Sequence, residues 1–156
     1  SVIVTEMGVL EFRDGAAEYM TERLGVEDEL PRALDQRTWI GPDRVWASVS
    51  PVVMDQFPRR ELEAAAVVSR SLTRGGFPAP RRVRVERFSA IPGVPEAWRF
   101  DFRRPGQLKR PAFHVAVEFD ADVAGPIVLG QLRHFGLGLL RPAGQFGRAF
   151  LEEEEV

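Results

Sequence analysis

The sequence contains no cysteine and only two histidines, His114 and His134. A disulfide framework and a thiolate metal site are therefore excluded, and a histidine-rich metal centre is disfavoured. No apolar run approaches the ~20 residues that cross a bilayer, and no signal peptide is visible, so we expect a cytoplasmic protein. No P-loop, dinucleotide fingerprint or carboxylate pair is present, so we expect no cofactor, and a small-molecule enzyme is the less favoured class.

Basic residues are concentrated in one part of the chain. Residues 37–151 hold 18 of the 21 basic residues but only 10 of the 23 acidic ones, and 17 of those 18 are arginine. Residues 1–36 hold nine acidic and three basic residues, and residues 152–155 are all glutamate. Arginine suits phosphate and stacks on bases, and a basic face attracts a polyanion. A codon preference for arginine would explain its excess over lysine, but not this segregation.

The length of 156 residues and the hydrophobic fraction of 44% are those of one ordinary domain with an appendage. We divide the chain into an acidic N-terminal extension or remnant of a preceding domain at 1–36, a folded domain at 37–151 and an acidic tail at 152–156. The first residue is Ser rather than Met. We therefore expect a processed chain or a piece of a longer polypeptide.

The hydrophobic pattern predicts one mixed domain. The expected elements in the first half are a strand or hairpin over 1–12, a short helix that begins at Asp14 and ends at Gly25, a solvated acidic loop to residue 30, a strand over 45–54 with a bulge or edge position at Pro51, and a helix over 59–74. Those in the second half are a hairpin of strands 82–88 and 97–102, a strand over 113–119, a short helix over 127–130, a strand over 137–141, and a polar end from 143 whose Phe146 and Phe150 dock on the core. This order predicts an α+β, ferredoxin-like (RRM-like) βαββαβ domain with helices on one face of the sheet.

Three glycines, Gly130, Gly136 and Gly138, follow a G-x5-G-x-G spacing and enclose Arg133 and His134. Glycine reaches backbone angles that other residues avoid, and it lets a bulky ligand approach the main chain. A glycine-framed loop with a cation and an imidazole between two apolar runs is a candidate cradle for a phosphate backbone. The alternative is a tight connection in which the glycines only satisfy turn geometry.

A second candidate is the basic loop at 103–111. Its four cations are Arg103, Arg104, Lys109 and Arg110, with Pro105 and Gly106 as turn residues. A charge run of this kind is ordinarily a solvated loop. Because the loop is next to predicted strands rich in aromatic residues, the more specific alternative is that its cations clamp an RNA phosphate.

Three stretches together resemble a known family: WASVSPVVMD at 46–55, HVAVEF at 114–119 and GPIVLGQLRHFGLGLLRP at 125–142. They are similar to the C-terminal half of the fused CRISPR subunit of type I-U (I-G) systems. That half resembles the repeat-processing endoribonucleases of the RAMP superfamily. The likeness runs from about residue 34 to residue 142, and the family member is a longer polypeptide whose first half resembles a backbone-binding Cascade subunit.

The resemblance implies an RNA-binding endoribonuclease that cleaves precursor CRISPR RNA within its repeats without metal. The RNA 2′-OH would attack the adjacent phosphate and leave a 2′,3′-cyclic phosphate and a 5′-OH. The implied partners are CRISPR repeat RNA and other Cascade subunits. Histidine suits the acid–base work because its ordinary pKa of about 6.5 lies near working pH.

The two histidines are assigned different roles under this hypothesis. We expect His134, inside the glycine loop beside Arg133, to be the base. His114, on the non-core side of its strand, is the next candidate, as acid or RNA contact. Arg133 and the four cations of the basic loop would bind phosphates.

Two alternatives keep the fold without catalysis. In the first, the domain is a structural subunit that only binds the repeat of the CRISPR RNA, and another nuclease cuts it. In the second, the charged surface contacts a protein partner. Binding that weakens steeply as salt rises would favour RNA over protein.

Overall fold

The computed structural model falls into two compact units, Ser1–Asp35 and Gln36–Val156. It describes the residues 2–4, 9–14, 17–22, 35–54, 61–100 and 111–153. Side chains are described for residues 35–54, 63–100 and 111–153.

The first unit is a three-stranded antiparallel sheet of β1 (Val2–Val4), β2 (Val9–Asp14) and β3 (Ala17–Glu22), in the order β1-β2-β3. The helix predicted from Asp14 to Gly25 is wrong where it can be judged, because residues 17–22 form a strand. Asp14 pairs with Ala17, so β3 folds back onto β2 after two residues. The backbone of β2 then supplies the hydrogen-bond partners that a helix would find within itself. Residues 23–30 lie outside the described residues.

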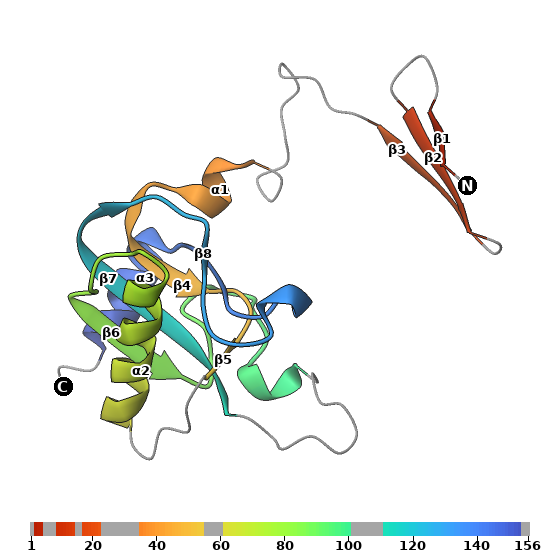
Figure 1. Ribbon diagram of the computed structural model, residues 1–156. Helices are drawn as coiled ribbons and strands as arrows, with labels where there is room; N and C mark the ends of the chain where they lie inside the picture. The colour runs from red at the N-terminus through yellow and green to blue at the C-terminus, as the bar shows by residue number, and fades with distance from the viewer. Residues whose placement is uncertain are drawn as a thin grey trace. The chain divides into compact units, whose positions relative to one another are not determined.

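The second unit contains the remaining elements (Figure 1). They are α1 (Arg37–Ile40), β4 (Asp43–Ser48), β5 (Val52–Val53), α2 (Glu61–Arg74), β6 (Arg82–Glu86), the 3-10 turn η1 (Ala97–Arg99), β7 (Ala112–Val123), β8 (Ile127–Val128), the 3-10 turn η2 (Arg133–Phe135), β9 (Leu139–Pro142) and α3 (Gly144–Glu152). In the described part of the chain, every helix is too short or too polar to cross a bilayer.

The strands of this unit form one antiparallel sheet of six strands in the order β5-β7-β4-β9-β8, with β6 also paired to β7. Both β4 and β6 pair with Ala116, Val117 and Glu118, so they lie on opposite edges of β7. Strand β5 continues along the edge that β4 occupies, after a break that contains Pro51. The α+β class is confirmed, and the arrangement is compatible with the ferredoxin-like fold.

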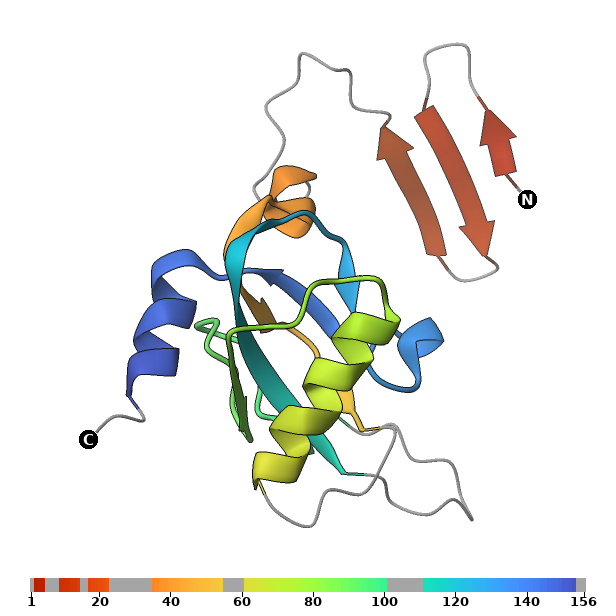
Figure 2. The ribbon, with the colours of Figure 1, turned by 60° about the vertical axis from the view of Figure 1, so that its left-hand side comes forward.

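Helix α2 covers one face of the sheet (Figure 2). The alternation predicted for the strand over 113–119 holds here, because Val115, Val117 and Phe119 all point into this core. Trp46 is also fully buried in it, and its indole N–H donates to the carbonyl oxygen of Asp43 at 2.9 Å. This large core fixes the position of β7 at the centre of the domain.

Helix α3 covers the opposite face, where the sequence suggested only a polar end. Val45, Ala47 and Ala116 from the sheet pack against Phe150 and Leu151. The structure therefore places one helix on each face rather than all helices on one. Phe150 docks on the core as expected, whereas Phe146 stays 50% exposed.

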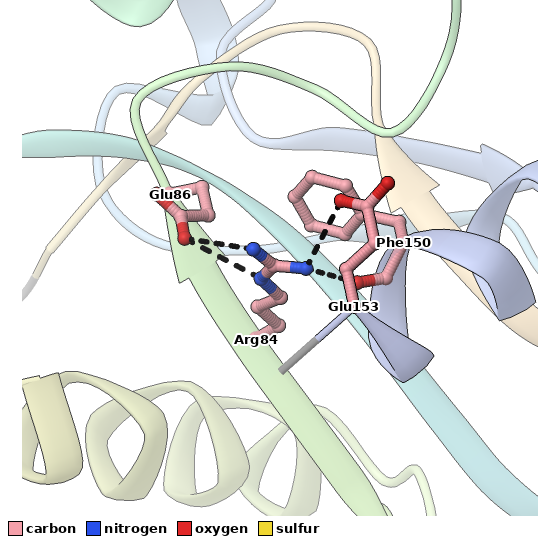
Figure 3. Close-up of polar contacts among 4 residues, drawn as sticks. All are labelled: Arg84, Glu86, Phe150 and Glu153. Atoms are coloured by element: carbon pink, nitrogen blue, oxygen red, sulfur yellow. Dashed lines mark hydrogen bonds and ion pairs between the residues drawn. The ribbon is translucent and has the colours of Figure 1, made fainter. Parts of the chain in front are cut away.

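Arg84 of β6 holds the C-terminal end of α3 (Figure 3). Its Nη1 donates to the carbonyl oxygen of Phe150 and lies 3.7 Å from a carboxylate oxygen of Glu153. Its Nη2 lies 3.2 Å from Glu86, and the guanidinium sits 4.3 Å from the centre of the Phe150 ring. A cation at the last carbonyls of a helix stabilises it. The guanidinium of Arg84 therefore has a structural role, because it joins α3 to β6.

Two further local predictions are wrong. Strand β6 pairs with β7 rather than with residues 97–100, because residues 97–99 form η1 and the amide of Ala97 donates to the carbonyl oxygen of Arg87 at 2.8 Å. Residues 101 and 102 of the predicted second strand lie outside the described residues. The short helix over 127–130 is instead β8, with Ile127 opposite Leu140. A run of three apolar residues fits helix and strand equally well, and here the neighbouring strand decides.

Candidate nucleic-acid interface

The loop between β8 and β9 is hydrogen-bonded at both ends to β5 and to Pro51, which directly precedes it. The amide of Gln131 donates to the carbonyl oxygen of Val53 at 2.9 Å, near the start of the loop. The amide of Gly138 donates to the carbonyl oxygen of Pro51, also at 2.9 Å, near its end. Both ends of the loop are therefore held by the sheet, and the residues between them are presented from a fixed base.

The three glycines of the loop serve different purposes. All three have positive φ, between 74° and 79°. A Cβ at Gly130 would lie 2.3 Å from the carbonyl oxygen of Val53, and one at Gly138 would lie 1.9 Å from that of Leu129. A Cβ at Gly136 would meet nothing within 4 Å. Gly130 and Gly138 therefore permit close packing within the protein, and Gly136 is the one with open space beside it.

Turn η2, at the outer end of the loop, exposes Arg133, His134 and Phe135. Leu132 just before it is left-handed, with φ 59°, whereas the turn itself is right-handed. A change of hand of this kind points successive N–H groups in one direction and favours an anion. Among the described residues, the amides of Arg133 and His134 have no carbonyl acceptor. The turn thus combines a cation, an imidazole, an aromatic ring and backbone donors.

Arg133 differs from several other arginines in its charge environment. Arg44 lies 3.4 Å from Asp122, Arg82 lies 2.6 Å from Glu118, and Arg99 lies 3.0 Å from Glu96. No carboxylate within the described ranges forms an ion pair with Arg133. Its positive charge is therefore available to an external anion.

His114 is placed in the interior and not on an accessible face. The residue is 1% exposed, and the ring of Phe100 lies 6.2 Å from its imidazole on the same side of β7. Its Nε2 donates to the carbonyl oxygen of Pro95 at 2.9 Å, and the hydroxyl of Ser48 donates to its Nδ1 at 2.9 Å. The same hydroxyl accepts the amide N–H of Val115. The carbonyl can only accept, so these partners define a neutral tautomer with the proton on Nε2.

The expectation that His114 lies on a non-core side is therefore wrong. Both of its ring nitrogens are bonded within the protein, so the geometry gives it a structural role and no support to the predicted catalytic one. His134 is exposed, and the two imidazoles do not form a pair. Arg103, Arg104, Lys109 and Arg110 lie outside the described residues, so their part in the site stays a prediction.

Acidification should destabilise the protein through His114. Burial lowers the pKa of His114 below its ordinary 6.5, although interactions with the backbone of Pro95 and the backbone of Ser48 oppose the shift. The unfolded chain then binds more protons than the folded one just below pH 6.5, so stability is full above that pH and falls as the pH decreases. The loss is at most about 1.4 kcal/mol for each unit of pKa shift. Urea unfolding at pH 7.5 and pH 5.5 measures it.

The control separates the two histidines. His114→Gln should lose most of this pH dependence, whereas His134→Gln should keep it. A wild-type protein that becomes more stable at pH 5.5 than at pH 7.5 would contradict the assignment, as would a His114→Gln variant with the wild-type dependence.

Phe135 is the site residue that sequence reasoning missed. It is 65% exposed in η2. The signal was present, because an aromatic residue follows directly on the arginine and histidine inside the glycine frame. An apolar ring between two apolar runs is more readily interpreted as core, and only the fixed base of the loop shows that it points outward.

An α+β domain that presents an arginine, a histidine and an aromatic ring on one fixed turn has the composition of a nucleic-acid-binding module. The sequence profile of the CRISPR-associated protein, GSU0054 family, matches residues 21–142, which include most of the sheet and the whole glycine loop. The chain belongs to this family and is a CRISPR-associated protein. No curated protein and no solved structure matches it.

Proposed function

We propose that this protein is a CRISPR RNA endoribonuclease that binds the repeat of the precursor at η2 and cleaves it there without a metal ion. The observation that carries the proposal is the exposure of Arg133 and His134 side by side on a turn whose ends are hydrogen-bonded to the sheet. The resemblance to the fused subunit of type I-U systems supports the choice of repeat RNA as substrate and of other Cascade subunits as partners.

The covered sheet also favours this loop as the site. Open sheet modules bind RNA by stacking bases on the face of the sheet. Here α2 covers one face and α3 covers the other, and both faces are packed with apolar side chains. RNA therefore has to bind at the edges and loops of the domain, where η2 presents a cation and an aromatic ring.

The proposed mechanism uses two side chains of η2. His134 takes the proton of an RNA 2′-OH, and that oxygen attacks the adjacent phosphorus. The guanidinium of Arg133 stabilises the negative charge that develops on the phosphorane oxygens. The bond to the 5′-oxygen breaks, and that oxygen takes a proton from solvent because His114 is buried. The products are a 2′,3′-cyclic phosphate and a 5′-OH.

The test is incubation of the protein with a repeat hairpin RNA in the presence of EDTA. We expect a single cut within the repeat, at the same position and rate when Mg²⁺ is in excess. Cleavage that occurs only after Mg²⁺ is restored would contradict the mechanism. A DNA hairpin of the same sequence is the control, because it lacks the 2′-OH and should remain intact.

A second function is favoured by the burial of His114. Within the described residues His134 is the single accessible histidine, so no second imidazole is available to protonate the leaving oxygen. A domain with one exposed histidine can bind repeat RNA as a structural subunit while another nuclease cuts it. Tight, salt-sensitive binding of the hairpin without any cleavage by the wild-type protein would select this function.

A further inference from the structure

Trp98 projects from η1 with 65% of its side chain exposed. Tryptophan is usually well buried, as Trp46 is in this protein with 0% exposure. The neighbouring Ala97 is buried at 4%. Turn η1 therefore packs against the protein through Ala97 and exposes the indole of Trp98 to solvent.

The backbone that carries Trp98 is held at two points. The amide of Ala97 donates to the carbonyl oxygen of Arg87 at 2.8 Å. The carbonyl oxygen of Pro95 accepts from the buried imidazole of His114 at 2.9 Å. His114 lies in β7, and Arg87 directly follows β6, so the sheet fixes the backbone that carries the indole. A fixed backbone limits the entropy lost on binding.

Trp98 also lies in the most basic part of the sequence. Residues 81–110 contain nine basic and three acidic residues. Arg87, whose backbone bonds to Ala97, is exposed, and the side chain of Arg99 is 68% exposed. Arg99 is paired with Glu96 at 3.0 Å, so Arg87 is the exposed cation on the adjoining backbone that is left for a phosphate. An exposed aromatic ring near an exposed arginine is a combination that binds single-stranded nucleic acid, through stacking on the base and attraction to the phosphate.

We infer that Trp98 stacks on an unpaired base of the CRISPR RNA, in a contact separate from the cleavage site at η2. The inference rests on the proposed function, since it assigns a second RNA contact to the same protein. The charge of residues 81–110, nine basic against three acidic, favours a polyanion as the occupant. Tryptophan and arginine are also enriched at protein interfaces, so a protein partner is an outcome that the experiment tests. Stacking tolerates any base, so this contact adds affinity and places no demand on the sequence of the unpaired nucleotide.

The experiment measures binding of a fluorescein-labelled repeat hairpin that carries single-stranded extensions. Trp98→Ala should weaken binding about tenfold, and Trp98→Phe should keep most of the affinity because phenylalanine still stacks. Phe146→Ala is the matched control: it removes another half-exposed aromatic ring, on α3, and should bind like wild type. The wild-type protein should also lose tryptophan fluorescence when the RNA binds, and Trp98→Phe should lose less.

The outcomes distinguish this inference from the function on which it rests. If the wild type does not bind the hairpin at all, the proposed function is rejected, and the inference with it. If the wild type binds but Trp98→Ala binds equally well, or if Phe146→Ala weakens binding as much, stacking by Trp98 is rejected and the proposed function stands. A Trp98→Ala variant that binds RNA normally but no longer retains another CRISPR-associated subunit would assign the residue to a protein interface and overturn the inference.

Discussion

Replacement of His134 by alanine is expected to slow the cleavage of repeat RNA by about 100-fold or more, the usual contribution of a general base. The affinity for the RNA should change little, because Arg133 and the backbone of η2 remain. His134 is exposed, so the substitution removes no core contact and should leave the unfolding transition unchanged. Single-turnover cleavage at saturating protein measures the chemical step without the contribution of binding.

Two variants make this result interpretable. Arg148→Ala removes an exposed cation from α3 and should cleave at the wild-type rate. Arg133→Ala should impair both cleavage and binding, and it should reduce the dependence of affinity on salt concentration. Wild-type cleavage by His134→Ala would remove the base assignment. If a His114 variant is folded but inactive while His134→Ala is active, the base is His114 on β7 and not His134.

Replacement of Gly138 by alanine is expected to destabilise the protein by about 3 kcal/mol or more. The φ of +74° alone costs an L-residue roughly 1–2 kcal/mol. A Cβ would also lie 1.9 Å from the carbonyl oxygen of Leu129, which is backbone and cannot rotate away. The amide of Leu129 donates to the carbonyl oxygen of Gly138 at 2.8 Å, so relief of the clash would break this contact too.

Gly136 is the matched control within the same loop. Its φ is +79°, but a Cβ there would meet nothing within 4 Å. Gly136→Ala should therefore show only the conformational cost, about 1–2 kcal/mol. Urea unfolding of the two variants under the same conditions measures the difference. Equal destabilisation by the two substitutions would contradict the packing role of Gly138.

The sequence was sufficient for the elements whose periodicity is clear. The strict alternation of residues 113–119 and the three-and-four spacing of residues 59–74 predicted β7 and α2, and both are present where they are described. The face of β7 that packs in the core is the predicted one. The predicted stripe of α2 is wrong apart from Leu72: the sequence pattern favoured the stripe Leu62, Ala65, Ala66, Ser69 and Leu72, whereas the helix buries Ala64, Val67, Val68 and Leu72.

The elements that depend on distant neighbours could not be predicted in this way. Residues 127–128 and 97–99 have apolar patterns that suit more than one structure. Pairing with β9 decides the conformation of the first segment, and anchoring to Arg87 decides that of the second. The burial of His114 depends on contacts with Ser48, Pro95 and Phe100, none of which is close to it in the sequence. No local pattern around His114 contains that information.

The candidate site was predicted in part. The spacing of the glycines singled out the loop that carries Arg133 and His134, and both residues are exposed there. Their part in RNA binding and cleavage stays a prediction. The sequence could not show why positions 130 and 138 require glycine. Gly130 packs against backbone atoms of Val53, and Gly138 packs against those of Leu129. Contacts of this kind depend on the fold around the loop, and spacing in the sequence does not report them.

The chemistry of the ends of the cleaved RNA tests the central claim most directly. Attack by the 2′-OH must leave a 2′,3′-cyclic phosphate on the upstream fragment and a 5′-OH on the downstream one. We predict that the downstream fragment accepts label from polynucleotide kinase without prior phosphatase treatment, and that mass spectrometry finds the cyclic phosphate. A 5′-phosphate with a 3′-OH, or an intact hairpin that is nevertheless tightly bound, would contradict the account.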